Sequence, residues 1–408
     1  MHELINQERL TSDLQQLGQF GRQPGGGITR HALTEAHQNA RRWLTERMQE
    51  AGATVHVDGA ANVIGRWDCG LPDAQSLVIG SHLDTVPEGG MFDGALGVLA
   101  GLECARTIQE QGQSLPWHLE VIDFTDEEGH YNAGTFGSRA MLGMVTEDEI
   151  NEHKTGTTCI ADALASLNLA PQGVLTAKRP ARDFRAYFEL HIEQGSHLEQ
   201  GGYDVGIVTG IVGIYRYAVS IAGRRGHAGT TPMPARQDAL VRAAPIFSLL
   251  PAWCQAQSDQ LVGTIGQVEL LPGAVNVIPG QCNFTVELRA MDSHHMLSIK
   301  EKLITCVKEH PKSRMSIVLE KDSELMDEAL MSLLERAAQD KKHCRMPSWA
   351  GHDAQSFSPH VPTAMVFVPS HGGVSHSSDE WTDFSQAARG VEVLTDAICQ
   401  LAEDERKG

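Results

Sequence analysis

The sequence predicts an α/β protein in which a mixed, mostly parallel sheet carries helices on both faces and a small α+β domain is inserted into the chain. Strand and helix patterns alternate through the first third of the chain, which favours a parallel sheet. Near Gly210 the pattern changes to two strand-and-helix units, and helix and strand patterns with acidic and histidine clusters resume after about Asp327. A chain of 408 residues exceeds one ordinary hydrophobic core. We therefore predict one discontinuous domain over 1–210 and 328–408 and an inserted domain over 211–327.

The first elements are an amphipathic helix and a pair of strands. Apolar residues at helical spacing run from Thr34 to Ala51, where Thr34 can cap the first turn and Gly52 follows the last. Residues 55–57 and 62–67 then show the pattern of a strand pair. In the insert we predict strands over 215–222 and 284–289 and helices over 235–250 and 293–309.

Two short buried strands each lead into polar side chains. A glycine-rich loop over 88–94 lies between them and leads into a helix that reaches about Gln111. Because the carboxyl ends of parallel strands meet at one edge of a sheet, the polar clusters are expected to meet there. The strands are residues 77–80, followed by Ser81-His82-Leu83-Asp84, and residues 119–124, followed by Thr125-Asp126-Glu127-Glu128-Gly129.

The composition limits the classes of partner. A formal net charge of −19 argues against nucleic acid, because phosphate binding needs a basic surface. No segment is long and apolar enough to cross a bilayer, and Met1 to Gln7 lack the basic and apolar regions of a secretion signal. The eight cysteines show no paired spacing and are expected to be free thiols. We therefore expect a cytoplasmic protein that binds neither nucleic acid nor membrane.

Acidic and imidazole side chains at the strand ends have the chemistry of a metal site. His82 and Asp84 share one side of an extended segment, so the carboxylate can orient an imidazole that binds metal. Asp93 follows glycines that let the loop fold back toward the strand end, and it could bridge two ions. Of the adjacent Glu127 and Glu128, one can bind metal while the other handles the proton of an attacking water.

Two further histidines extend the set. His191 follows an apolar strand over 187–190, and His376 lies in a glycine-rich loop after a strand over 364–368. Imidazole and carboxylate ligands together suit zinc, manganese, cobalt or nickel, and the sequence does not choose among them. His352 and Asp353 could be taken for another ligand pair, but five ligands already fill two sites, so we assign these two a structural role or one of supporting the metal ligands.

These motifs, in their order, resemble those of the bacterial N-carbamoyl-L-amino acid hydrolases and allantoate amidohydrolases, the carbamoylase branch of the dinuclear metallopeptidase superfamily. The resemblance runs from Gly25-Gly26-Gly27-Ile28-Thr29-Arg30 to Ser375-His376 and covers nearly the whole chain. It implies two divalent metal ions per subunit. The segment His191-Ile192-Glu193-Gln194-Gly195 points toward carbamoyl substrates, because the peptidase branches tend to place a carboxylate at the ligand equivalent to His191.

The resemblance implies a role for each matching residue. Glu127 would be the general base that deprotonates the attacking water and then protonates the leaving nitrogen. Asp84 would orient His82. The implied metal ligands are His82 and His191 for one ion, Glu128 and His376 for the other, and Asp93 as the bridge between them.

The resemblance also implies that the insert is the dimerisation or lid domain of a homodimer. His227 would reach the active site of the partner subunit and donate to the oxygen that develops negative charge. Asn276 and Arg289 would hold the carboxylate of a small substrate, Arg289 by a two-pronged contact that lysine cannot reproduce. The other implied substrate contacts are Gln194, Arg216 and Ser375.

The sequence departs from the family pattern in three places, and the first two are expected near the substrate pocket. Where relatives often read Gly-Gln-Arg-Arg, this chain has Gly213-Ile214-Tyr215-Arg216, so one arginine remains. His130-Tyr131-Asn132 replaces the usual Ser-Arg-Phe, and Ser378 replaces the common proline after His376. None of these changes touches a metal ligand, but they leave the substrate open.

The expected reaction is metal-dependent hydrolysis of a linear amide C–N bond. The leading hypothesis is removal of the N-carbamoyl group from an L-amino acid or β-ureido acid, giving the amine, CO2 and ammonia. Allantoate amidohydrolysis is the runner-up, slightly weakened by the missing arginine, and cleavage of an N-acyl amino acid or dipeptide comes third. A metal-free binding or scaffold protein would lack ligands or the base, whereas all five ligands and Glu127 are present here.

Overall fold

The computed structural model describes residues 5–131, 133–153 and 158–407. The chain divides into two compact units, a first unit of Met1–Thr209 with Leu325–Gly408 and a second unit of Gly210–Glu324. Asn132, one of the departures from the family pattern, lies outside the described residues.

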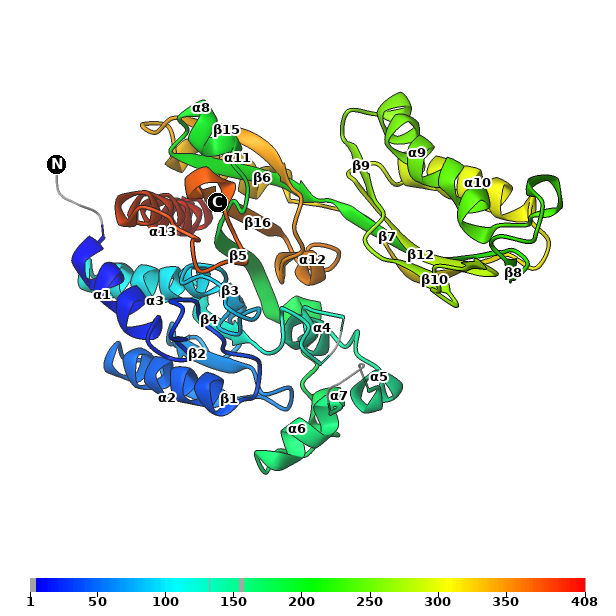
Figure 1. The fold of residues 1–408 in the computed structure, drawn as a ribbon. Helices are drawn as coiled ribbons and strands as arrows, with labels where there is room; N and C mark the ends of the chain where they lie inside the picture. Colours follow the sequence, from blue (N-terminus) through cyan, green and yellow to red (C-terminus); the bar gives the residue numbers. More distant parts are fainter. Residues whose placement is uncertain (1–4, 132, 154–157, 408) are drawn as a thin grey trace. The chain divides into compact units, whose positions relative to one another are not determined.

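The first unit is built on a mixed sheet, which has nine strands among the described residues (Figure 1). The order is β1-β2-β4-β3-β5-β16-β6-β14, and β15 also pairs with β6. The four central strands β4, β3, β5 and β16 are parallel, whereas β1, β2 and β6 pair antiparallel to their neighbours. The strands are β1 Thr54–Val57, β2 Val63–Trp67, β3 Ser76–His82, β4 His118–Phe124, β5 Phe184–Ile192, β6 Val205–Ile211, β14 Glu324–Leu325, β15 His343–Ser348 and β16 Thr363–Val368.

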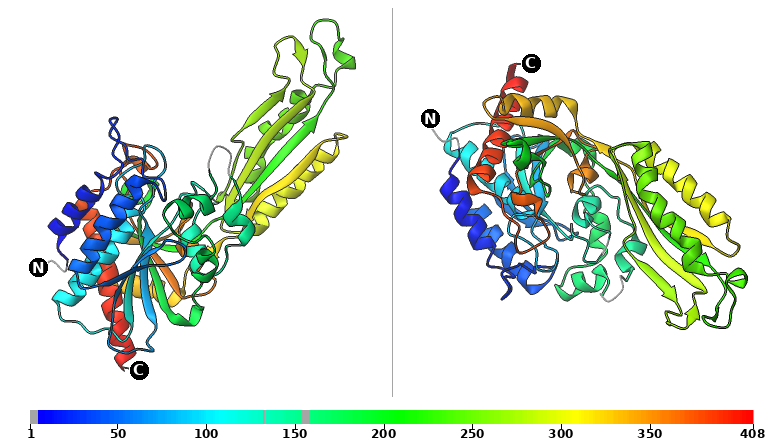
Figure 2. Two further views of the ribbon diagram at one scale, coloured as in Figure 1. Left: turned by 90° about the horizontal axis from the view of Figure 1, so that it is seen from below. Right: turned by 45° about the horizontal axis from the view of Figure 1, so that its top comes forward.

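Helices cover both faces of this sheet, which confirms the predicted fold class. On one face α3 and α13 lie side by side (Figures 1 and 2), with Gly101 of α3 close against Ile79 and Val121. On the other face Phe357 of α12 stacks on Tyr187, with ring centroids 4.2 Å apart. The helices are α1 Gln7–Leu17, α2 Glu35–Glu50, α3 Ala95–Glu110, α4 Phe136–Met141, α5 Glu147–Asn151, α6 Ile160–Ser166, α7 Gly173–Thr176, α8 His197–Gly201, α11 Glu328–Ala337, α12 Ala354–Phe357 and α13 Phe384–Lys407, with 3-10 turns η1 Ala181–Asp183 and η3 His371–Gly373.

The helix predicted over 34–51 is α2, and its first turn corrects one detail. Thr34 occupies the cap position with extended backbone, but its side chain caps no helical amide. Instead the Thr34 hydroxyl donates to the carbonyl oxygen of His31 at 2.7 Å. Propensity alone identifies a residue that can cap a helix, whereas the path of the preceding loop decides whether the hydroxyl does so.

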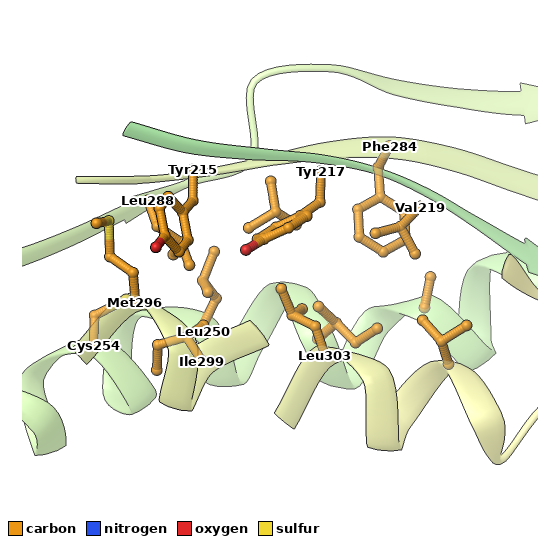
Figure 3. Packing of buried hydrophobic residues seen from close by; sticks show 14 of the residues in the cluster. Tyr215, Tyr217, Val219, Leu250, Cys254, Phe284, Leu288, Met296, Ile299 and Leu303 are labelled. Carbon is orange, nitrogen blue, oxygen red and sulfur yellow. The ribbon is translucent and has the colours of Figure 1, made fainter. Parts of the chain in front are cut away.

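The second unit packs two helices against one face of a five-stranded antiparallel sheet, ordered β10-β12-β7-β13 with β9 also paired with β12. Figure 3 shows aromatic and aliphatic side chains of β7 and β12 meeting those of α9 and α10 in a buried core. A separate pair, β8 and β11, forms a two-stranded sheet. The elements are β7 Gly213–Ala222, β8 Gly226–His227, η2 Met233–Ala235, α9 Ala239–Gln257, β9 Leu261–Thr264, β10 Val268–Leu271, β11 Val277–Ile278, β12 Gln281–Ala290, α10 Ser293–Lys308 and β13 Arg314–Lys321.

The two faces of this second sheet differ in exposure. Along β7, buried residues alternate with partly exposed ones, as expected for a sheet covered by helices on a single face. Arg216 of β7 lies directly opposite Glu287 of β12 in the pairing, and both project from the face that the helices leave open. Polar side chains of the second unit are therefore presented on that open face.

Two expectations about the whole chain can be compared with the structure. All eight cysteines are free thiols, as their irregular spacing predicts. Among the described residues, every helix is too short or too polar to cross a membrane.

Candidate active site

The candidate metal-binding side chains come together at the carboxyl ends of the four parallel strands. His82 is the last residue of β3, and His191 lies one residue before the end of β5. Glu128 follows the end of β4, and His376 follows β16 after the turn η3. Asp93 lies two residues before α3, which begins at Ala95 after the cap residue Gly94. Parallel pairing thus gathers residues from distant parts of the sequence at one edge of the sheet.

The Asp93 carboxylate lies between two imidazoles near one of its oxygens and a third imidazole near the other. Its Oδ1 is 3.1 Å from Nε2 of His191 and 3.9 Å from Nε2 of His82, and its Oδ2 is 3.2 Å from Nε2 of His376. The His376 ring is also 3.8 Å from Oε2 of Glu128. Two sets of ligand atoms therefore each lie within 4.8 Å of one another, namely those of His82, Asp93 and His191 and those of Asp93, Glu128 and His376.

Backbone carbonyls fix which imidazole nitrogen faces the site. Nδ1 of His82 is 2.9 Å from the carbonyl oxygen of Asp84, and Nδ1 of His191 is 2.8 Å from that of Ile192. A neutral ring that donates from Nδ1 has no proton on Nε2, so Nε2 is the atom that would bind a cation. Nε2 of His191 faces Asp93 at 3.1 Å and the amide of Gly94 at 3.3 Å. The imidazole nitrogens and carboxylate oxygens gathered here are donors that divalent transition metals prefer. The residues present therefore fit a pair of such ions.

The structure corrects the expected role of Asp84. The backbone carbonyl of Asp84 holds the His82 ring, with its oxygen 2.9 Å from Nδ1. The carboxylate oxygen of Asp84 lies 3.8 Å from the same nitrogen, which is too far for a hydrogen bond. The Asp84 carboxylate accepts instead from the backbone amides of Glu127 and Glu128, at 3.3 and 3.1 Å. Asp84 thus joins the end of β3 to the segment that carries the two glutamates.

Glu127 lies beside the first set of ligands. Its Oε2 is 3.6 Å from Nε2 of His82, and its side chain is largely buried. Burial first, and then the charges of Asp353 and Glu128, raise the pKa of Glu127 well above its ordinary value. Burial opposes ionisation of Asp93 as well, but the adjacent imidazoles of His191 and His376 outweigh it and hold the pKa of Asp93 well below the usual range. The two carboxyl groups therefore differ in their affinity for a proton, which is high for Glu127 and low for Asp93.

Unusual backbone conformations surround these groups. Gly94 has φ +63, and a Cβ at this position would lie 2.4 Å from the His82 ring, so only glycine allows the loop to approach the imidazole. Gln194 and His376 also have positive φ, 59° and 55°, although neither is glycine. Such conformations cost energy and cluster at functional sites, where the surrounding structure holds them in place.

Gln194 and Ser375, predicted to contact substrate, both contact the candidate metal centre. Nε2 of Gln194 donates to Oδ2 of Asp93 at 3.0 Å and to Oγ of Ser375 at 3.2 Å. The same nitrogen lies 3.4 Å from Nε2 of His376. These two side chains are therefore placed beside the bridging carboxylate.

The remaining predicted site residues lie in the second unit and form two pairs. Nε of Arg216 and Nε of Arg289 each donate to the carboxylate of Glu287 at 2.9 Å. His227 and Asn276 meet at the two-stranded sheet, where His227 pairs with Val277. There the carbonyl of Asn276 accepts from the amide of Ala228 at 3.0 Å.

The His227 ring has a defined orientation. Its Nδ1 accepts from the backbone amides of Gly229 and Thr230, at 3.0 and 3.2 Å. A ring nitrogen that accepts two N–H groups has no proton of its own, so a neutral His227 carries its proton on Nε2. The exposed His227 can therefore donate a hydrogen bond from Nε2 to a ligand.

Several buried polar residues that sequence reasoning did not assign to the site support it. Arg30, the last residue of the N-terminal glycine-rich motif, is fully buried and donates to the carbonyl of Leu83 at 2.6 Å. Arg41 pairs with Asp123 at 2.6 Å, and Asp123 accepts from the amide of Leu83 at 2.9 Å. The sequence contains one signal for this support. Arg41 is a charged residue on the buried face of a predicted helix, where an unpaired charge is unfavourable.

His352 and Asp353 lie next to the metal-binding candidates. The His352 ring is 4.5 Å from that of His191, and its Nε2 is 2.9 Å from Oγ of Ser348. Atoms of Glu189, His191 and His352 also lie within 4.8 Å of one another. The carboxylate of Glu189 already accepts from the Ala354 amide at 2.9 Å, so a structural role for this neighbourhood remains our interpretation.

A mostly parallel sheet with imidazoles and carboxylates gathered at its carboxyl edge is the arrangement of a metal-dependent α/β enzyme. Comparison with known proteins agrees, because residues 78–400 match peptidase family M20/M25/M40. The chain therefore belongs to this family, and its relatives show that it is an amidohydrolase of the carbamoylase type.

The relatives are similar over almost their whole length. An N-carbamoyl-L-amino acid amidohydrolase of Geobacillus stearothermophilus is 37% identical over 98% of this chain and 100% of its own. An allantoate amidohydrolase of Escherichia coli is 34% identical over 95% of this chain and 96% of its own. The crystal structure of a hydantoinase/carbamoylase family amidase from Burkholderia phymatum is 34% identical, with a TM-score of 0.86 and 98% of both chains covered.

Proposed function

We propose that this enzyme hydrolyses the N-carbamoyl group of an L-amino acid or β-ureido acid with two divalent metal ions per subunit. The observation that carries the proposal is the placement of Asp93, whose two carboxylate oxygens face different imidazole groups. Glu127 beside His82 places a carboxyl group within reach of the same space. In the reaction, water adds to the carbamoyl carbon, the bond to the amino nitrogen breaks, and the released carbamic acid decomposes to CO2 and ammonia.

The residues of this chain divide the work. His82, His191, Asp93, Glu128 and His376 would hold the ions, which supply Lewis acidity that polarises a carbonyl group and makes water more acidic. Glu127 takes the proton of the attacking water and returns it to the leaving amino nitrogen. Asp84 keeps Glu127 in position through the backbone amides of residues 127 and 128. Nε2 of His227 from the partner subunit would donate to the carbonyl oxygen as negative charge develops.

A substrate panel tests the proposed reaction. Purified enzyme loaded with manganese, cobalt, zinc or nickel is offered N-carbamoyl-L-amino acids, β-ureido acids, allantoate, N-acetyl-L-amino acids and dipeptides. We expect ammonia and free amino acid to appear in equal amounts from the carbamoyl substrates, with the highest kcat/KM. Release of amino acid without ammonia, from acyl substrates or dipeptides alone, would contradict the proposal.

Allantoate amidohydrolysis is the second candidate function. The similarity to allantoate amidohydrolases of Escherichia coli and Bacillus subtilis, at 34% and 33% identity, favours it. Against it, the identities to three N-carbamoyl-L-amino acid amidohydrolases are 35–37%, and one arginine of the common pair is replaced by Tyr215, whose side chain is buried in the core of the second unit. A higher kcat/KM for allantoate than for every carbamoyl amino acid would decide for this second function.

Arg289 gives the first prediction about substrate binding. Its guanidinium can hold the substrate carboxylate with two parallel N–H groups, whereas lysine offers one point charge. We expect Arg289→Lys to raise KM about 10–100-fold, the effect of one charge-assisted hydrogen bond, with kcat changed much less. Steady-state kinetics measure both constants. Arg42→Lys, at an exposed arginine on α2, is the control, and an unchanged KM in Arg289→Lys would remove Arg289 from the site.

We further propose a homodimer that forms through the second unit. Strand β13 pairs with β7 alone among the described residues, so its outer edge is open. Ile317 and Val318 on this edge are 57% and 55% exposed, and an open apolar edge strand is a template for pairing with another chain. A second copy of β13 would satisfy both the backbone groups and the apolar side chains.

The open edge leads to a prediction about assembly. We expect Ile317→Asp to convert the dimer into monomers, because a charge at the paired edge opposes its association. Light scattering measures the mass. Val241→Asp, at an exposed position of α9, should remain dimeric. Because His227 would act in the partner's site, the monomer should also lose most turnover; a wild-type protein that is monomeric at working concentration would refute the prediction.

We place the enzyme in the cytoplasm as part of the same proposal. Its eight cysteines are all free thiols, and a reducing compartment keeps thiols in this state.

A further inference from the structure

We propose that Glu380 is a positioning residue that sets the bridging carboxylate and His376 relative to each other for metal binding. This inference rests on the proposed function. One oxygen of Glu380, Oε1, accepts from the backbone amides of Phe92 and Asp93, both at 3.0 Å. The other, Oε2, accepts from the hydroxyl of Ser375 at 3.0 Å. A single buried carboxylate thus holds the bridging residue with one oxygen and the neighbour of a metal ligand with the other.

These contacts belong to a closed ring of hydrogen bonds around the bridging carboxylate. From Glu380 the ring runs through the amide of Asp93 to its side chain, where Oδ2 accepts from Gln194 at 3.0 Å. The same Gln194 nitrogen donates to Ser375 at 3.2 Å, and the Ser375 hydroxyl returns to Glu380. Both oxygens of Glu380 therefore contact segments that contain candidate metal ligands, the segment of Asp93 and the segment of His376.

The loop that carries Asp93 is shaped around Glu380. A Cβ at Gly90 would lie 2.1 Å from Oε1 of Glu380, so the absence of a side chain there lets the loop close over the carboxylate. The ring of Trp381, the residue after Glu380, meets that of Phe92 edge-on with ring centroids 5.4 Å apart. The segment after His376 is thus packed directly against the segment before α3.

A purely structural carboxylate would be an unfavourable choice in this place. Glu380 is 4% exposed, and its charge lies near that of Asp93, so burial and repulsion both oppose an anion. Three hydrogen-bond donors offset that cost. The contacts of Glu380 fix the separation between two metal-binding segments that are far apart in the sequence. Removal of a residue that supports metal ligands in this way commonly lowers metal affinity about 10–100-fold.

The test compares Glu380→Ala with Glu380→Gln. Each protein is stripped of metal and titrated with Mn²⁺ or Zn²⁺ in competition with a chromophoric chelator, and its thermal midpoint is measured without metal. We expect Glu380→Ala to weaken metal binding about 10–100-fold. Glu380→Gln should stay within a few-fold of wild type, because its amide oxygen can accept from both backbone amides while its nitrogen donates to Ser375. Asp379→Ala, an exposed neighbour, is the control.

Each outcome decides the matter. Wild-type metal affinity in Glu380→Ala, or equal damage in Glu380→Gln, would overturn the positioning role. If Glu380→Ala does not fold, Ser375→Ala tests the same ring and should weaken metal binding, whereas Ser378→Ala on the exposed side of the loop should not. Equal metal affinity in both serine variants would also overturn it. A wild-type chain that binds no metal at all would instead defeat the proposed function.

Discussion

Replacing Glu127 by glutamine is expected to lower kcat by about 10²–10⁴-fold, the usual contribution of a general base. The amide has the shape of the carboxyl group but cannot take a proton from water at neutral pH. Because Glu127 lies outside the two sets of ligand atoms, metal content should stay at the wild-type level. Ammonia release under saturating metal measures the rate, and elemental analysis measures the metal.

The matched control for this prediction is Glu88→Gln. Glu88 is exposed in the loop before Asp93, so its charge can be removed without touching the candidate site. Wild-type turnover in Glu127→Gln would eliminate Glu127 as the base. Loss of metal in the same variant would instead assign Glu127 to metal binding.

Asp93→Ala is expected to remove both metal ions, because the carboxylate contributes one oxygen to each set of ligand atoms. His376→Ala should remove one ion, since His376 belongs to a single set. Turnover should fall below detection in Asp93→Ala. Elemental analysis after gel filtration reports the number of ions per chain for each variant.

The comparison between these two variants separates bridging from ordinary ligation. Asp73→Ala, an exposed carboxylate that precedes the amino end of β3 and so lies away from its carboxyl end, should retain the wild-type number of ions. If Asp93→Ala loses only one ion, Asp93 belongs to one site and the two groups are independent. Full retention of metal in that variant would place the ions elsewhere.

The fold class and the cluster of candidate metal ligands could be predicted from the sequence, because both follow from residue type and strand order. Imidazoles and carboxylates stand out after apolar strands, and parallel pairing requires the strand ends to meet at one edge. The helix α2 and the central strands β3 and β4 follow from apolar spacing, and their bounds agree with the predicted ranges to within about two residues. The prediction for α9 was less accurate. The predicted helix spans residues 235–250, whereas α9 begins at Ala239 and extends to Gln257.

The partner of each polar group depends on turn geometry, which residue spacing does not report. The two-residue spacing of His82 and Asp84 predicts a contact between side chains, yet the chain turns so that the carbonyl faces the ring and the carboxylate faces the next strand end. The proposed role of Glu380 rests on contacts with the backbone amides of Phe92 and Asp93. These residues lie 288 and 287 positions earlier in the chain. No local pattern in the sequence reports a contact of that range.

The central claim is that one carboxylate and its neighbouring imidazoles hold two catalytically required ions. Its most direct test is elemental analysis of the wild-type enzyme combined with ammonia release from an N-carbamoyl-L-amino acid before and after chelation. We predict two divalent ions per chain, complete loss of turnover when they are removed, and recovery when manganese, cobalt, zinc or nickel is added back. Undiminished turnover in protein shown to be free of metal would contradict the claim.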